Sequence, residues 1–136
     1  MLNELAKEVY NIAKAHGWHE EDRGFPEIVA LCHSELSEAL EEYRNGRPNK
    51  WYACEEISGS GNTCDPQDQY ECANYSFKDK CKYRSAKPEG IAVEMADCII
   101  RILDWCGKEK IDIDSIIREK INFNQTRPYR HGGKKA

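Results

Sequence analysis

His33-Ser34-Glu35-Leu36-Ser37-Glu38 lies inside a helical pattern that runs from about Pro26 to Arg44. On a helical wheel, the apolar stripe of this pattern also contains two glutamates, Glu35 and Glu42. Glu38 follows Glu35 at the edge of the stripe, so both carboxylates project from one side of the helix. A carboxylate that faces a core must be paired or must bind a metal, because an isolated buried charge costs too much free energy. The stretch therefore predicts a core-forming helix that carries a chemical site.

Three further helices follow from patterns of the same kind. Gly17 suits a left-handed cap at the end of the first helix, and Pro88 suits the first position of the third. Either Asp112 or Asp114 is expected to cap the fourth. The four helices are predicted at residues 2–15, 26–44, 88–107 and about 112–127.

Residues 47–87 have a different character. Gly, Ser, Asn, Asp and Tyr scatter there without a helical or strand period, and four cysteines appear. We interpret this segment as an irregular, cysteine-rich insertion between helices two and three. The expected fold is all-α, a four-helix bundle in one domain that covers residues 1–136, with the insertion at 47–87.

The third predicted helix carries a second acidic pair, Glu94 and Asp97. If this pair faces the first pair, the two helices together offer four carboxylates. Such hard oxygen ligands suit Mg²⁺ or Mn²⁺ better than zinc. On the fourth helix, Lys120, Asn124 and Arg127 fall on the stripe expected to face the core. A metal site of this kind beside basic groups suits a triphosphate. The metal ion and the basic side chains would together neutralise the negative charge of its oxygens.

The acids have two other interpretations. A Glu-x-x-Glu pair on one helix is often only a solvated or salt-bridged surface feature, but a second acidic pair in the same bundle argues against that here. A di-iron carboxylate bundle expects Glu-x-x-His on two helices. None of the four histidines has a glutamate three residues before it. An oxygen-ligated magnesium or manganese site is therefore predicted.

Both acidic motifs have recognisable surroundings. Glu35-x-x-Glu38 lies within Ser34-Glu-Leu-Ser-Glu-Ala-Leu-Glu-Glu, and Glu94-x-x-Asp97 lies within Val93-Glu-Met-Ala-Asp-Cys-Ile-Ile-Arg. The tail continues from Lys120, Asn124 and Arg127 into Pro128-Tyr129-Arg130-His131-Gly132-Gly133. In these features the chain resembles the MazG-like nucleoside triphosphate pyrophosphohydrolases of the all-α NTP pyrophosphatase superfamily. The resemblance covers helices two to four well, helix one loosely and the insertion not at all. The gap between the acidic motifs is much longer than that family usually has.

The resemblance implies a MazG-like helical bundle that hydrolyses an NTP or dNTP to the monophosphate and pyrophosphate, as nucleotide-pool housekeeping. It implies that Mg²⁺ (or Mn²⁺) is bound by the catalytic acids, which are Glu35, Glu38, Glu94 and Asp97. It also implies substrate contacts from Lys120, Asn124, Arg127 and Arg130. The alternative from another class is a non-catalytic binding module that uses a metal-stabilised insertion as its recognition surface.

The composition indicates the class of protein and the compartment in which we expect it. With 136 residues, 40% of them hydrophobic and 32% charged, the chain has the profile of a soluble globular protein. A formal net charge of -4 argues against general nucleic-acid binding, although the tail is locally basic. The first residues carry no signal-peptide pattern, and no run approaches the roughly 18 apolar residues of a membrane span. We expect a cytoplasmic protein that does not enter membranes.

The third predicted helix also indicates an oligomer. Apolar residues lie on both sides of its polar seam, and one short bundle cannot cover both. A homodimer or homotetramer is therefore expected, with Val93, Ile100 or Leu103 near the contact.

Cysteines have two predicted roles. Three fall on apolar helix faces and are expected to act as small core residues: Cys32, Cys98 and Cys106. The other four lie in the insertion: Cys54, Cys64, Cys72 and Cys81. In a reducing compartment these four would suit a structural zinc site, and an iron–sulfur cluster, two disulfides or free thiols are the alternatives.

Overall fold

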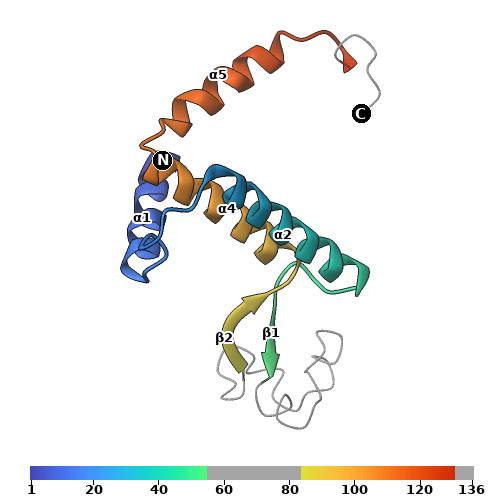
Figure 1. Cartoon of the computed structure of the whole chain (residues 1–136). Coiled ribbons are helices and arrows are strands. Elements are labelled where there is room, and N and C mark those ends of the chain that lie inside the picture. Colours follow the sequence, from blue (N-terminus) through green and yellow to red (C-terminus); the bar gives the residue numbers. More distant parts are fainter. Residues whose placement is uncertain (55–83, 131–136) are drawn as a thin grey trace. The chain divides into compact units, whose positions relative to one another are not determined.

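The computed structural model describes residues 1–54 and 84–130 of the chain (Figure 1). Its helices are α1 (Leu2–Ala15), α2 (Phe25–Arg44), α4 (Ile91–Lys108) and α5 (Ile113–Gln125), and its strands are β1 (Trp51–Cys54) and β2 (Arg84–Glu89). Helix far outweighs strand in these ranges, which confirms the predicted all-α class. None of the helices there combines the length and the apolar character that a membrane span requires.

The chain divides into two compact units. The terminal unit comprises Met1–Ile28 and Ile100–Ala136, and the central unit comprises Val29–Ile99. Helices α2 and α4 each contribute residues to both units. All four predicted metal-binding acids belong to the central unit. The four-helix bundle and the single domain over 1–136 stay predictions.

The terminal unit has a small core, formed by Ala6, Leu103 and Cys106, with Leu2, Ile111 and Ile113 packed against it. Gly107 lets α4 approach α1 closely, because a Cβ at that position would lie 2.3 Å from the Ala6 carbonyl oxygen. Leu103 is only 3% exposed. Its side chain packs inside this unit, and the expectation that Val93, Ile100 or Leu103 lies near a subunit contact stays a prediction.

Helix ends in the terminal unit follow the predicted caps. The N–H groups of Gly17 and Trp18 donate to carbonyl oxygens in the last turn of α1, and Gly17 has a φ of +82°. This arrangement is the expected glycine cap. Asp112 caps α5 by accepting a hydrogen bond from the Ser115 N–H at 3.1 Å. Both caps confirm the predicted ends.

Asp114, the other candidate for that cap, has a different role. Its carboxylate accepts hydrogen bonds from the Leu2 N–H at 3.2 Å and the Asn3 N–H at 3.0 Å. In return, the Asp114 N–H donates to the Asn3 side-chain oxygen at 3.1 Å. Asp114 therefore satisfies the first N–H groups of α1 and joins the start of α1 to the start of α5.

The central unit contains α2, the start of α4 and the antiparallel pair β1–β2 (Figure 1). Trp51 pairs with Glu89, and Tyr52 pairs with Pro88. The predicted helix start at Pro88 is therefore wrong, because Pro88 lies in β2 and α4 begins at Ile91. Both strands of a two-stranded sheet are edge strands, where proline is tolerated.

Gly90 joins β2 to α4 with a φ of +120°. The N–H groups of Ile91 and Ala92 donate to the carbonyl oxygens of Pro48 and Asn49, at 3.4 and 2.9 Å. A Cβ at Gly90 would lie 2.7 Å from the Pro48 oxygen. Only glycine fits here, so this junction fixes the start of α4 against the segment that leads into β1.

The predicted insertion, 47–87, is described only at its ends. Those ends form β1 and β2, so the expectation of a segment without strands is wrong there. The predicted four-cysteine site lies outside the described residues, apart from the backbone of Cys54 at the end of β1. The helix cysteines are placed as expected of core residues, with Cys98 and Cys106 buried and Cys32 half-buried.

Candidate metal centre

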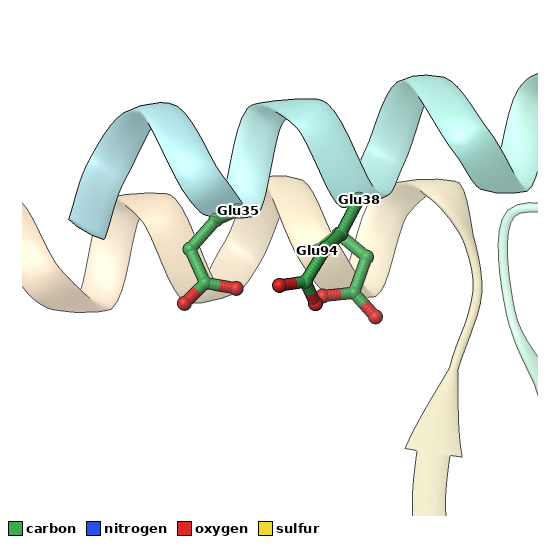
Figure 2. Close-up of side chains that lie close together, drawn as sticks. All are labelled: Glu35, Glu38 and Glu94. Atoms are coloured by element: carbon green, nitrogen blue, oxygen red, sulfur yellow. The ribbon is translucent and has the colours of Figure 1, made fainter. Parts of the chain in front are cut away.

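Three of the four predicted acids meet in the central unit. Figure 2 shows Glu35 and Glu38 extending from α2 and Glu94 from α4, with their carboxylates on the same side of the two helices. One carboxylate oxygen from each residue lies within 4.8 Å of the others. Glu35 and Glu94 are only 6% and 7% exposed, whereas Glu38 is exposed. Two buried acids and one at the surface thus form a compact group, hereafter the glutamate cluster.

The α2 sequence explains how the cluster is placed. Ile28 and Ala39 are buried on the same stripe as Glu35, as the wheel predicted. On α4, Cys98 lies one turn after Glu94 and is also buried, and the Cys32 thiol approaches its carbonyl oxygen at 4.0 Å. The contact between Cys32 and Cys98 therefore brings α2 and α4 together close to the acids, and Figure 2 shows the two helices side by side there.

Glu94 is the most perturbed acid of the cluster. Burial raises the pKa of its carboxyl group, and the negative charges of Glu38, Asp97, Glu35 and Glu89 raise it further. Among the described residues, no hydrogen bond or ion pair to its carboxylate offsets this cost. A largely buried glutamate whose carboxylate faces two others is in the electrostatic state that a bound cation would relieve.

Asp97 is not part of the close group. It is half-buried on α4, one turn beyond Glu94, and its charge contributes to the raised pKa of Glu94. It is therefore near enough to add negative charge to the site. Its assignment as a direct metal ligand stays a prediction.

Glu42 was also predicted to face inward, and it has a partner instead of a place in the cluster. The Trp51 indole N–H donates to its carboxylate at 2.7 Å, and both side chains are at least partly buried. Glu38, one turn earlier, accepts a hydrogen bond from the Ser34 hydroxyl at 3.3 Å. On this side of α2, Glu42 therefore supports the hairpin, whereas Glu35 and Glu38 belong to the cluster.

The donor set fits a small divalent cation. The cluster offers only oxygen atoms, with no nitrogen or sulfur that would favour zinc. Oxygens bound to one Mg²⁺ at about 2.1 Å lie at most about 4.2 Å apart. The three oxygens lie within 4.8 Å of one another, so the side chains would move closer together to bind one Mg²⁺, in which neighbouring ligand oxygens are about 3 Å apart. Three protein ligands leave the other positions for water and phosphate oxygens.

The predicted substrate contacts belong to the terminal unit. Lys120 and Asn124 are exposed on α5, and Arg127 is half-buried just after it. Arg130 is exposed and has a left-handed φ of 50°. Because these residues and the cluster are in different units, their role as substrate contacts stays a prediction.

Two charged residues near the cluster were not predicted. Glu89 contributes to the raised pKa of Glu94, and Lys87 pairs with Glu89 at 2.8 Å. Both lie in β2, a segment interpreted from sequence as the end of an insertion and the start of a helix. Only the pairing of β1 with β2 places them, and local periodicity carries no signal of such a pairing.

Three glutamates from two helices, two of them buried, thus form an all-oxygen donor set that could hold a metal ion. Comparisons of the chain with protein-family models, curated proteins and solved structures found no match.

Proposed function

We propose that the protein is a Mg²⁺-dependent nucleoside triphosphate pyrophosphohydrolase, which converts an NTP or dNTP and water to the monophosphate and pyrophosphate. The observation that carries the proposal is the glutamate cluster, in which Glu94 is buried next to Glu35 and Glu38. The resemblance of both acidic motifs to the MazG-like enzymes supplies the reaction class. Mn²⁺ could replace Mg²⁺, because both ions prefer oxygen ligands.

Each part of the site has a chemical task. Glu35, Glu38 and Glu94 would bind the cation, which when bound supplies positive charge to the phosphate oxygens. Asp97 adds negative charge beside them, and one carboxylate would accept a proton from the attacking water. The water oxygen forms a bond to the α phosphorus, and the bond from that phosphorus to the bridging oxygen breaks. Pyrophosphate then leaves.

The proposed activity is tested by measuring pyrophosphate released from a panel of NTPs and dNTPs, with Mg²⁺ and with EDTA. We expect pyrophosphate instead of single phosphate, and complete loss of release in EDTA. Glu38→Gln and Glu94→Gln keep side-chain volume but remove a charged ligand. Each should lower kcat/KM by about 100-fold or more, the size expected when a principal electrostatic contact is lost.

The matched control is Glu41→Gln. This glutamate is exposed on α2, outside the cluster, and the substitution removes the same charge from the same helix. It should leave kcat/KM within about twofold of wild type, as expected for a surface change. Near-normal turnover in both Glu38→Gln and Glu94→Gln would overturn the assignment of the site.

A further inference from the structure

The β1–β2 hairpin presents one of its faces to the acidic side of α2. Trp51 and Glu89 are directly paired across the strands, so their side chains lie on the same face of the hairpin. The Trp51 indole reaches Glu42 on α2, one helical turn from Glu38. The face that carries Trp51 and Glu89 is therefore directed toward the side of α2 that carries the cluster.

Lys87 is paired with a residue of that face. It precedes Glu89 by two residues in β2, next to an irregularity of the strand register between Tyr52 and Cys54, so strand alternation alone does not place its side chain. Its ammonium group contacts the Glu89 carboxylate at 2.8 Å. This ion pair places the ammonium group of Lys87 beside the hairpin face that carries Trp51 and Glu89.

Lys87 is also within electrostatic range of the metal site. The pKa of its ammonium group is raised by the hydrogen bond to Glu89, and the charges of Glu94 and Asp97 raise it further. Its side chain is 73% exposed. Lys87 is therefore a solvent-accessible cation, paired with Glu89 on the hairpin, whose charge interacts with those of Glu94 and Asp97.

The position of Lys87 is fixed by the chain around it. Gly90, three residues later, is fitted against Pro48 and Asn49, and it joins the end of β2 to the start of α4. Glu94 lies in the first turn of α4. The lysine and the buried glutamate are thus held on one short continuous segment.

We propose that Lys87 is a substrate-binding residue, whose ammonium group contacts the phosphate chain of the nucleotide held at Glu35, Glu38 and Glu94. This inference rests on the proposed pyrophosphohydrolase activity and adds a contact from the hairpin. In the free protein, the ammonium group is paired with the Glu89 carboxylate, which competes with a substrate for it. A polyphosphate bound there presents a higher density of negative charge than one carboxylate, so Lys87 exchanges Glu89 for phosphate oxygens.

The test compares Lys87→Met with Glu89→Gln. If Lys87 binds substrate, Lys87→Met raises KM for the best NTP about tenfold, the usual loss for one charge-assisted contact, with kcat within about threefold. Glu89→Gln frees the lysine and leaves KM equal or lower. Lys87→Arg, which keeps the charge, restores most of the affinity. Each of these results supports the proposal.

A second readout does not depend on turnover. Calorimetric titration with inorganic pyrophosphate in Mg²⁺ should show weaker binding to Lys87→Met than to wild type, by a similar factor. Binding of Mn²⁺ alone, followed by electron paramagnetic resonance, should not weaken, because the cluster is intact.

Three results would overturn the inference. Lys87 is only a structural partner of Glu89 if wild type is active and Lys87→Met has unchanged KM and pyrophosphate affinity. The same holds if Lys87→Met and Glu89→Gln show equal losses of substrate affinity. If wild type neither releases nor binds pyrophosphate with Mg²⁺, the proposed function fails and the inference fails with it.

Discussion

At the scale of single residues, the most informative group is the carboxylate of Glu94. Most buried acids are stabilised by a donor or a cation, as Glu42 is by the Trp51 indole. Glu94 is instead buried among negative charges, and its pKa is raised mainly by burial. Without a cation, ionised Glu94 therefore lowers the stability of the folded protein.

Replacing Glu94 by glutamine should reveal this loss of folded-state stability independently of any effect on activity. In EDTA near neutral pH, Glu94→Gln is expected to unfold at a temperature several degrees higher than wild type, from a gain on the order of 1 kcal/mol. Mg²⁺ should raise the melting temperature of wild type but not that of the variant. Thermal melts in EDTA and in millimolar Mg²⁺ measure both effects. Equal Mg²⁺-induced shifts in the two proteins would contradict the assignment.

The raised pKa of Glu94 also gives a pH dependence. Its folded pKa lies above the ordinary value of 4.5, so the folded state holds the proton more tightly than the unfolded state. The stability contributed by the protonated form is full below the unfolded pKa and is lost as pH rises through the folded pKa. Mg²⁺ competes with that proton. The Mg²⁺-induced shift in melting temperature should therefore grow between about pH 5 and about pH 8 in wild type, and stay near zero at both pH values in Glu94→Gln. A larger shift at the lower pH would refute this.

At the scale of secondary-structure elements, the junction between β2 and α4 determines where the site lies. Gly90 has a left-handed backbone and no room for a Cβ, and the N–H groups that follow it bond to carbonyl oxygens of the chain before β1. The first turn of α4, with Glu94, is thereby held in place. The hairpin is thus part of the support of the site.

Gly90→Ala should disturb both the fold and metal binding. The new methyl group would meet the Pro48 oxygen, and the positive φ adds strain, so we expect a loss of at least about 1–2 kcal/mol of unfolding free energy. Because Glu94 follows by one turn, Mn²⁺ affinity should fall as well. Gly24→Ala is the matched control, since a Cβ there would meet only ordinary contacts. A Gly90→Ala variant with the stability and Mn²⁺ affinity of wild type would show that the junction does not position the site.

Local sequence signals predicted most of the helices well but misplaced the start of α4. Helical periodicity and caps predicted α1, α2 and α5 closely, because both are local properties of the chain. Pro88 misled the prediction of α4, since proline suits a helix start as well as an edge strand. Only the pairing of Pro88 with Tyr52, far away in the sequence, decides between the two.

The residues of the candidate site also divide into those that the local sequence predicts and those that it does not. Glu35 was predicted on the buried stripe, and Glu35, Glu38 and Glu94 do come together, because helix spacing determines which side chains share a face. Lys87 and Glu89 could not be predicted, since the hairpin that carries them depends on contacts between distant segments.

At the scale of the whole molecule, much apolar surface remains on α5 and α4. Helix α5 has no buried residue, and after Ile113 its large apolar side chains are exposed in the single chain: Ile116 at 52%, Ile117 at 37%, Ile121 at 44% and Phe123 at 56%. On α4, Ile100 is 45% exposed. Large exposed apolar surface commonly marks a contact with another protein.

We expect a second copy of the chain to cover this surface, in a homodimer or homotetramer. Light scattering after size exclusion, at micromolar concentration, should give at least twice the chain mass of 15.7 kDa. Ile121→Glu places a charge on the exposed apolar side of α5, where burying it would cost several kcal/mol, and should shift the mass toward that of one chain. Asn122→Glu adds the same charge to the opposite side of the helix and should leave the mass unchanged, since a solvated glutamate costs little there. A wild-type protein that has the mass of one chain at this concentration would refute the oligomer.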